Sequence, residues 1–403
     1  MPRGPAIMTI QTIAVREKPR AARPTAPHAL NRQIEVLLRR LRLAVVHGGD
    51  KTVPGSVLAV SANQRSWKSY KPVAQDIADA MARLGCRHPI EVLADDMHLA
   101  TKLREGSAHM AWLNTAGVQG SSAITHTPGL MEMLGLPYVG HEPLIAGILD
   151  NKHLFKQQLV AAGIPTAPSL LVRPSDRVFS PSQDERFQRV FGACRGPFVV
   201  KPVSGRASLN VTFVDSIVRL REAIAAVTTA TGAPVLIERY LAGAEYCVAV
   251  CGPTVARGGV LEMLDQPFVF SALERKLEAD EKIFTSMDVK PISGERARLL
   301  DPERDRATVA RLSELARAVF TEFGLETLIR LDIRADEDGN LFILEANPKP
   351  DLKAPQEGKT SLVSIGLSEH GMSYDDLILS VFANSVERLL ANGHDGIGRL
   401  AGL

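Results

Sequence analysis

The sequence predicts a mixed α/β protein in which a unit built on a parallel sheet precedes units rich in antiparallel strands. Between residues 41 and 140, short apolar strands alternate with helical stretches, the order that gives a parallel sheet with helices on its faces. Between residues 327 and 348, two strand-like runs flank a turn that contains Asp338-Gly339, which is typical of a β-hairpin. The chain has 403 residues, more than one core of about 100 to 200 residues, so we expect several packed subdomains.

Composition favours an ordinary soluble enzyme, since 45% of the residues are hydrophobic and 23% are charged. No uninterrupted apolar run approaches the roughly 20 residues that span a bilayer, and the N-terminus lacks the basic-then-apolar order of a secretory signal. We therefore expect a cytoplasmic protein without a membrane partner.

Basic charge is concentrated at the N-terminus. Residues 1–42 carry nine Lys and Arg against two acidic residues, whereas the remainder carries 38 against 43. A nucleic-acid arm needs such charge, but residues 16–27 are rich in Pro and Ala and contain no aromatic residue to stack on bases. We predict a partly disordered basic extension over residues 1–40, running into a helix at 29–40, and no nucleic-acid partner.

The four cysteines are too scattered for a disulfide framework. Only Cys247 and Cys251 lie close together, in an apolar strand-like run without a second pair nearby. We expect reduced core cysteines there, and a metal pair is the alternative.

The remaining chain divides into an N-terminal α/β domain at 41–142, a central subdomain at 143–238 and a C-terminal subdomain at 239–395. The β-α-β order of the first predicts a Rossmann-like parallel sheet. Its expected strands are 41–49, 90–93 and 110–113, and its expected helices are 72–84 and 129–134. In the central subdomain we expect helices at 152–162 and 216–228 and strands at 198–202 and 235–240.

The hairpin carries the residues with the clearest chemistry. Because side chains alternate along a strand, Arg330 and Asp332 share one face, and Glu345 and Asn347 share one face of the returning strand. If the register pairs those faces, Asp332, Glu345 and Asn347 supply the oxygen ligands that Mg²⁺ prefers. Arg330 would then clamp a transferring phosphoryl group or a developing oxyanion. The alternative is a solvent-facing hairpin with ordinary ion pairs.

Two further segments suggest nucleotide contacts. Lys201 ends an apolar strand and opens a loop of small and hydroxylated residues, whose backbone N–H groups can approach phosphates. Glu238 and Glu245 flank a turn after the next strand, where they could hydrogen-bond a ribose or an adenine-linking segment. A plain surface turn and an exposed sheet edge are the alternatives.

In their joint order, these motifs resemble the ATP-grasp fold of the D-alanine-D-alanine ligase family. The matching pieces are Lys152, Lys201-Pro202, Glu238-Arg-Tyr-Leu-x-Gly243-x-Glu245, Arg330-x-Asp332 and Glu345-Ala-Asn347-Pro348. The resemblance covers about Leu41 to Leu390 and is strongest after Gly135. It implies an ATP-grasp fold of three subdomains, a homodimer, and ATP with two magnesium ions, or manganese, as cofactors.

The resemblance also implies residue roles. ATP would be bound by Lys152, Lys201, Ser208, Glu238, Glu245 and a lysine after Phe270, for which Lys276 is the first choice and Lys282 the second. Metal ions would be held by Asp332, Glu345 and Asn347, and Arg330 would contact the phosphorylated intermediate. The implied reaction moves the ATP γ-phosphoryl group to a small-molecule carboxylate, and an amine then attacks the acyl phosphate to form an amide. The expected lids are residues 204–210 and 274–282.

The family pattern breaks in the amino-acid half. The acidic Ser-Ala-Glu-type segment of the family is replaced by His47-Gly-Gly-Asp50-Lys-Thr-Val-Pro54-Gly55, and its His-Gly-x-x-Gly-Glu-Asp-Gly stretch by Asn114-Thr-Ala-Gly117-Val-Gln-Gly120-Ser-Ser. Candidate substrate residues are His126, Lys349 and Lys353, with solvated loop residues as the alternative. We therefore expect a carboxylate-amine ligase for a pair other than two D-alanines. An authentic D-alanine-D-alanine ligase and a catalytically inactive ATP-binding scaffold are the alternatives.

Overall fold

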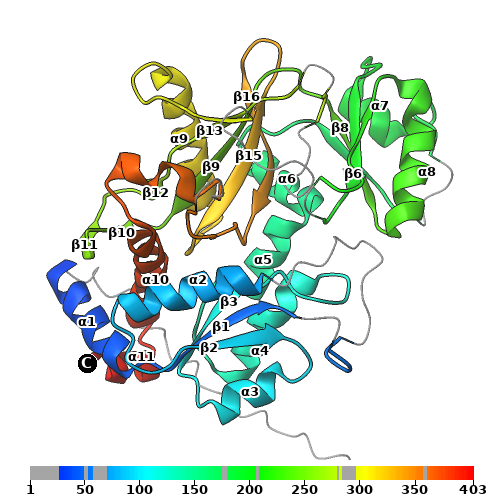
Figure 1. Cartoon of the computed structure of the whole chain (residues 1–403). Helices are drawn as coiled ribbons and strands as arrows, with labels where there is room; N and C mark the ends of the chain where they lie inside the picture. The colour runs from blue at the N-terminus through cyan, green and yellow to red at the C-terminus, as the bar shows by residue number, and fades with distance from the viewer. Residues whose placement is uncertain are drawn as a thin grey trace, which may run out of the picture.

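The computed structural model describes residues 27–49, 53–57, 70–174, 179–205, 208–278, 281–283, 296–356 and 361–403. The first 26 residues of the predicted basic extension lie outside the described residues, as do parts of both predicted lids. Figure 1 shows three lobes, each built around its own sheet. The predicted α/β class with one parallel and further antiparallel sheets is confirmed.

The N-terminal lobe contains a parallel sheet in the order β2-β1-β3-β4. Its strands are β1 (Leu43–Gly48), β2 (Glu91–Asp95), β3 (Met110–Asn114) and β4 (Tyr138–Val139), and its helices are α2 (Lys71–Arg83), α3 (Leu99–Glu105) and α4 (His126–Leu134), which follows the short turn η1 (Ala123–Thr125). Every residue of β1 is buried, as expected for a central parallel strand covered on both faces. The predicted β-α-β order is thus confirmed.

The ends of the described chain meet on this lobe. Helix α1 (Pro27–Arg40) packs against α11 (Asp395–Ala401), and Leu37 of α1 shares a core with Ile397 of α11 (Figure 1). The longer helix α10 (Tyr374–Ala391) packs on α2, on β4 and on the C-terminal hairpin of β10 (Thr254–Arg257) and β11 (Val260–Met263). This helix therefore ties the first lobe to the last.

The central lobe is an antiparallel sheet in the order β5-β8-β6-β7. Its strands are β5 (Ser169–Val172), β6 (Phe198–Pro202), β7 (Thr212–Val214) and β8 (Val235–Arg239), covered by α7 (Glu185–Phe191), η2 (Ile217–Arg219) and α8 (Leu220–Thr231). The apolar faces of these helices pack on the sheet, with Phe187 and Phe198 fully buried. The predicted helix and strands of this region are confirmed.

The C-terminal lobe is an antiparallel sheet in the order β14-β13-β9-β15-β16, and β12 also pairs with β9. The strands are β9 (Glu245–Cys251), β12 (Phe268–Val269), β13 (Leu273–Arg275), β14 (Ala297–Leu299), β15 (Ile329–Ala335) and β16 (Leu341–Asn347). Helix α9 (Arg306–Glu322) packs on it, and the turn η3 (Ser364–His370) precedes α10. Cys247 and Cys251 of β9 are buried free thiols, as predicted.

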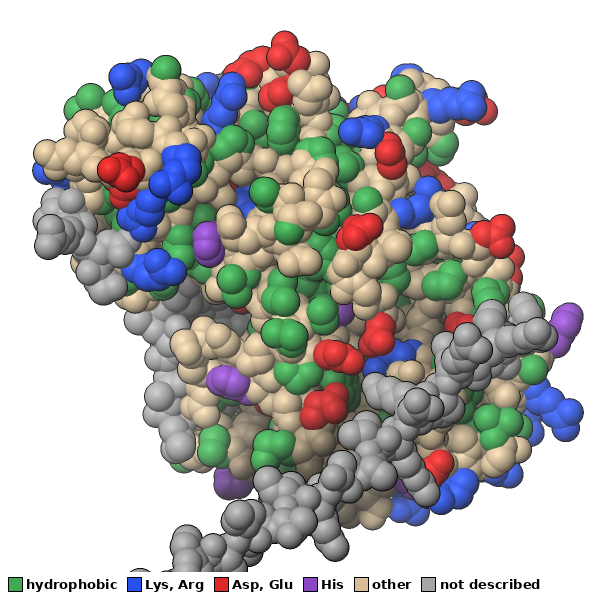
Figure 2. Space-filling view, turned by 180° about the vertical axis from the view of Figure 1, so that it is seen from behind, with side chains coloured by type: hydrophobic (Ala, Val, Ile, Leu, Met, Phe, Trp, Pro, Cys, Tyr) green, Lys and Arg blue, Asp and Glu red, His purple; other side chains and the backbone are tan. Residues whose placement is uncertain are grey.

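Two helices connect the lobes. Helix α5 (Pro143–Asp150) follows the parallel sheet, and α6 (Lys152–Ala161) packs against both β5 and β16. Beyond α6, Thr166 forms an isolated bridge with Ile343 of β16, so the central and C-terminal sheets meet there. Across the described residues, none of the helices combines the length and apolar character that a bilayer span requires. On the face in Figure 2, acidic and basic side chains are interspersed.

His141, between β4 and α5, makes stability depend on pH. Burial lowers the pKa of His141 to about 4, from 6.5 for an exposed imidazole. The folded protein then binds this proton less tightly than the unfolded chain, so stability is full above about pH 6.5 and falls as the pH approaches 4. The loss from this group reaches about 3 kcal/mol.

Urea unfolding at pH 7.5 and pH 5 measures this effect. We expect His141→Gln to flatten the pH dependence, whereas the exposed His98 (His98→Gln) serves as the control that leaves it unchanged. An unchanged pH slope in His141→Gln would contradict the assignment.

Candidate active site

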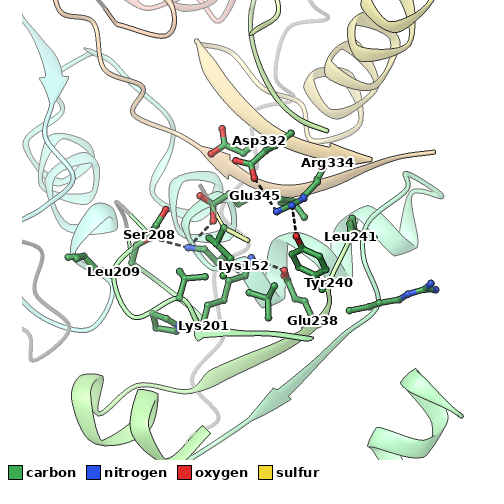
Figure 3. Close-up of a pocket in the computed structure, with 18 of the residues that line it drawn as sticks. Lys152, Lys201, Ser208, Leu209, Glu238, Tyr240, Leu241, Asp332, Arg334 and Glu345 are labelled. Carbon is green, nitrogen blue, oxygen red and sulfur yellow. Dashed lines mark hydrogen bonds and ion pairs between the residues drawn. The ribbon is translucent and has the colours of Figure 1, made fainter. Parts of the chain in front are cut away.

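A pocket lies between the central and C-terminal sheets (Figure 3), and residues from both sheets converge on it. Helix α6 contributes Lys152 at its first turn, and the loop after β6 contributes Ser208. The charged residues that line the pocket are Lys152, Lys201, Glu238, Arg239, Glu245, Arg275, Asp332, Arg334 and Glu345. Seven of the sequence-predicted residues therefore come together from segments almost two hundred positions apart.

The hairpin register pairs the two faces that carry the predicted metal ligands. Asp332 lies opposite Glu345, and Arg330 lies opposite Asn347. A register shift follows Asp332, and Leu344 and Glu345 both line the pocket. Asp332 and Glu345 thus face the pocket, whereas Arg330 and Asn347 sit one pleat further along the strands and do not line it.

Asp332 is held by two guanidinium groups. Arg330 Nε donates to its Oδ1 at 3.0 Å and Arg330 Nη2 to its Oδ2 at 3.2 Å. Arg275 Nη2 donates to both carboxylate oxygens at 3.3 Å. Burial alone raises the pKa of Asp332, but Arg275 and Arg330 outweigh it and hold the pKa below its usual value. The carboxylate is therefore ionised at neutral pH.

Lys152 connects the start of α6 with the loop after β6 and with the hairpin. Asn151 caps the helix, and its side chain accepts from Leu154 N. Lys152 Nζ donates to the Gly205 carbonyl at 2.9 Å and lies 3.3 Å from Glu345 Oε2. Its ammonium thus bridges the loop that is expected to approach phosphates and one expected metal ligand.

Glu238 lies between two buried lysines. Lys201 Nζ is 2.8 Å from its Oε2, and Lys156 Nζ is 3.1 Å from its Oε1. Burial lowers the pKa of Lys156 to about 8 against the opposing charge of Glu238. Burial also lowers the pKa of Lys201, but Glu238 and Glu345 together raise it above the usual value. Lys201, which lines the pocket, therefore remains fully charged.

The donors at the hairpin suit magnesium. Asp332 and Glu345 offer ionisable carboxylates from neighbouring strands, and Asn347 offers an amide oxygen on the same strand as Glu345. Such a set leaves coordination positions open for water and phosphate oxygens, which is the usual arrangement for Mg²⁺ at nucleotide sites. Within the described residues, no group of three His, Cys, Asp or Glu side chains is placed to hold a metal by itself.

Comparison with known families decides the identity. The model of the family described as D-ala D-ala ligase C-terminus matches residues 159–383. The chain belongs to this ligase family. It is an ATP-grasp carbon-nitrogen ligase, which uses ATP and magnesium to join a small-molecule carboxylate and an amine.

The individual relatives share little sequence identity with this chain. A D-alanine--D-alanine ligase of Pseudomonas putida (strain GB-1) is 26% identical over 349 residues, which are 86% of this chain and 93% of that protein. The structure of D-alanine--D-alanine ligase from Bacillus anthracis complexed with ATP superimposes with a TM-score of 0.62 and 18% identity, over 88% of this chain and 99% of the other. The VanG D-Ala:D-Ser ligase from Enterococcus faecalis gives a TM-score of 0.60 and 16% identity, over 86% and 99%.

Four polar residues of the pocket were not predicted as site residues: Arg239, Tyr240, Arg275 and Arg334. Arg334 of β15 donates to Tyr240 Oη at 2.9 Å and to Glu245 Oε2 at 3.4 Å. Its guanidinium carbon also lies 4.7 Å from the centre of the Tyr240 ring. The period-two spacing of Arg330, Asp332 and Arg334 is the signal that places Arg334 on this face.

The lysine predicted after Phe270 is not in the pocket. Lys276 follows the end of β13 and is exposed, whereas Arg275 lines the pocket. Lys282 contributes its backbone carbonyl, which accepts from Tyr240 Oη at 3.1 Å and from Arg334 Nη1 at 3.2 Å. The assignment of Lys276 or Lys282 to phosphate stays a prediction.

None of the three candidate substrate residues lines this pocket. His126, expected in a loop, is exposed at the first position of α4. Lys349 Nζ donates to Asn114 Oδ1 at 3.3 Å and lies 3.6 Å from the centre of the Tyr70 ring. Lys353 is half-buried after β16. These residues therefore stay candidates for a substrate site outside this pocket.

Gly243 allows the turn before Glu245 to approach the hairpin. A Cβ there would lie 2.5 Å from the Asp336 carbonyl oxygen and 2.8 Å from Ala335 Cβ. We expect Gly243→Ala to cost about 1 to 3 kcal/mol by overpacking and to weaken ATP binding by displacing Glu245. Urea unfolding and ATP titration measure both effects.

The matched control is Gly129→Ala. An added Cβ at Gly129 in α4 meets nothing within 4 Å, so this change should be neutral or stabilise by up to about 1 kcal/mol. Equal stability of the two variants would show that the turn at Gly243 can accommodate a Cβ.

Proposed function

We propose that this chain is a carboxylate-amine ligase that forms an amide through an acyl phosphate, with a substrate pair other than two D-alanines. The observation that carries the proposal is the pairing of Asp332 with Glu345 in a pocket that also contains Lys152 and Lys201. Carboxylates for metal and lysine side chains for phosphates then face the same space. Phosphoryl transfer requires little more from a protein than such positioning and charge.

In the proposed reaction, a carboxylate oxygen attacks the γ-phosphorus, and the bond to the ADP oxygen breaks. The amine nitrogen then attacks the acyl carbon, phosphate leaves, and the amine gives up a proton. Lys152, Lys201 and Ser208 would bind the ATP phosphates, and Glu238 and Glu245 the adenosine side.

The remaining roles belong to the hairpin. Asp332, Glu345 and Asn347 would hold two magnesium ions, or manganese, which neutralise phosphate charge and polarise the reacting oxygens when bound. Arg330 would stabilise the negative charge of the acyl phosphate and of the oxyanion that forms when the amine attacks.

The choice of substrates rests on the segments around the carboxyl edge of the parallel sheet. The chain has no glutamate at the place where the family carries one after the first strand, because residues 47–55 read HGGDKTVPG. Lys349 instead brings a positive charge to Asn114, at the end of β3. A cation at this edge favours a substrate with a carboxylate there over one with an ammonium group. Solved proteins of this fold are named for both D-alanine and D-serine, so the fold leaves the pair open.

ADP release tests the proposal. The purified chain is supplied with Mg-ATP and a panel of carboxylic acids and amines, and products are identified by mass spectrometry. We expect ADP release to require both an acid and an amine, and to yield an amide two hydrogens and one oxygen lighter than its parts. Efficient turnover with D-alanine alone would establish the authentic D-alanine-D-alanine ligase instead. ATP binding by calorimetry without turnover on any pair would favour an inactive scaffold.

We also propose a cytoplasmic location, because the reaction consumes ATP, and a homodimer by analogy with the family. Light scattering at several protein concentrations tests the oligomeric state.

A further inference from the structure

Arg275 is the pocket residue whose contacts bear most directly on the binding of metal and nucleotide. Strand β13 pairs antiparallel with β9, and the register sets Arg275 opposite Glu245. The side chain therefore points to the same face as Glu245 and lines the pocket, with only 10% of it exposed. The next residue, Lys276, is exposed.

The guanidinium of Arg275 joins three neighbouring strands. Its Nη1 donates to Glu245 Oε1 of β9 at 2.9 Å, while its Nη2 is shared between the two oxygens of Asp332 of β15 at 3.3 Å each. Charge-assisted N–H···O bonds are commonly about 2.7 to 2.9 Å long. The contact with Glu245 is thus the strong one, and the contact with Asp332 is long and divided.

A divalent cation at Asp332 would meet the positive charge of Arg275 on the same carboxylate. Like charges on one carboxylate repel, so the metal and Arg275 compete for Asp332. Arg275 can leave Asp332 without leaving the site, because Glu245 still anchors Nη1. Its Nη2 is then available in the pocket to an anion such as a phosphate group, for which a guanidinium is well suited.

We propose that Arg275 is a phosphate-binding residue of the ATP site, and that before ATP binds it occupies Asp332 and so opposes metal binding. This proposal rests on the ATP site of the proposed function. It makes metal binding follow nucleotide binding, since the phosphates both attract Arg275 away from Asp332 and supply further ligands for the metal.

Two binding measurements test it, and neither depends on turnover. In the first, ATP is titrated calorimetrically into the protein in EDTA, without metal. We expect Arg275→Met to weaken ATP binding about 10- to 100-fold, the usual range for a lost hydrogen bond to a charged group. Arg275→Lys, which keeps the charge but not the planar fork, should fall in between.

In the second measurement, Mn²⁺ is titrated without nucleotide and followed by electron paramagnetic resonance. We expect Arg275→Met to bind Mn²⁺ several-fold more tightly than the unaltered protein, because Asp332 has lost a competing cation. An arginine with only a structural role would not give this gain in affinity, because its removal would disorder Asp332 and weaken Mn²⁺ binding.

Arg298→Met is the matched control. Arg298 lies on the neighbouring strand β14 and likewise joins two carboxylates, Glu274 at 2.8 Å and Asp305 at 2.6 Å, but it does not line the pocket. We expect it to leave both affinities unchanged. Thermal unfolding of each variant confirms that it is folded before titration.

Unchanged ATP affinity in Arg275→Met, or weaker Mn²⁺ binding, overturns the proposal. A loss of ATP affinity in Lys276→Met in place of Arg275→Met overturns it as well. These outcomes are separate from failure of the proposed function, which shows itself as an absence of ADP release by the unaltered protein on every acid-amine pair.

Discussion

Replacing Asp332 by asparagine is expected to reduce ADP release by about a thousandfold or more. The asparagine keeps the size of the side chain but removes the negative charge that faces Glu345 across the hairpin and that Arg275 and Arg330 surround. Without it, the proposed metal site loses one of its two carboxylates. ADP release is measured at saturating acid and amine while the magnesium concentration is varied.

The control for this prediction is Asp338→Asn. Asp338 belongs to the same hairpin but is exposed in its turn, far along the strands from the pocket. We expect it to retain the activity of the unaltered protein. Turnover of Asp332→Asn within about tenfold of the unaltered protein would remove Asp332 from the metal site.

The second large effect concerns stability. Lys156 is completely buried, and its ammonium contacts Glu238, the Thr166 hydroxyl at 2.8 Å and the Ile343 carbonyl at 3.4 Å. Lys156→Met leaves Glu238 with Lys201 as its ammonium partner in the interior. Breaking a buried ion pair from one side costs about 3 to 5 kcal/mol, and urea unfolding should show a loss of this size.

Two comparisons separate charge from packing. Each single change, Lys156→Met or Glu238→Gln, removes the contact between Lys156 and Glu238, so the double variant should lose less stability than the sum of the two single changes. Lys102→Met removes a lysine whose pairing with Asp96 is partly exposed, and it should cost at most about 1 kcal/mol. A loss below that value in Lys156→Met would mean that this interior pair contributes little.

The hairpin could be predicted from the sequence because the residues that determine it lie close together in the chain. The alternation around Arg330, Asp332, Glu345 and Asn347 gives the faces, and the Asp338-Gly339 turn between the two runs gives the pairing. The register itself stayed conditional, because the observed pairs of Asp332 with Glu345 and Arg330 with Asn347 depend on the shift between Asp332 and Ile333, which the alternation does not predict. The same reasoning recovers the parallel sheet and the helices that cover it.

Arg275 and Lys156 were missed because their roles depend on distant partners. Strand β13 spans only Leu273–Arg275, too short for a period to show which of two adjacent cations faces inward; its pairing with β9 decides that. Lys156 stands one helical turn after Lys152 on α6, so the spacing does indicate a shared face. Its burial, however, comes from strands that lie far away in sequence.

The contact between Thr166 and Ile343 has a mechanical consequence. The bridge, the hydrogen bond from the Thr166 hydroxyl to the Ile343 carbonyl at 2.7 Å and the buried ammonium of Lys156 fasten the two sheets together at one edge of the pocket. If the sheets separate to admit ATP, this edge acts as a fixed axis, and the displacement grows with distance from it. A small rotation at Thr166 would then give its largest displacement in the parts of the two sheets that lie farthest from this bridge.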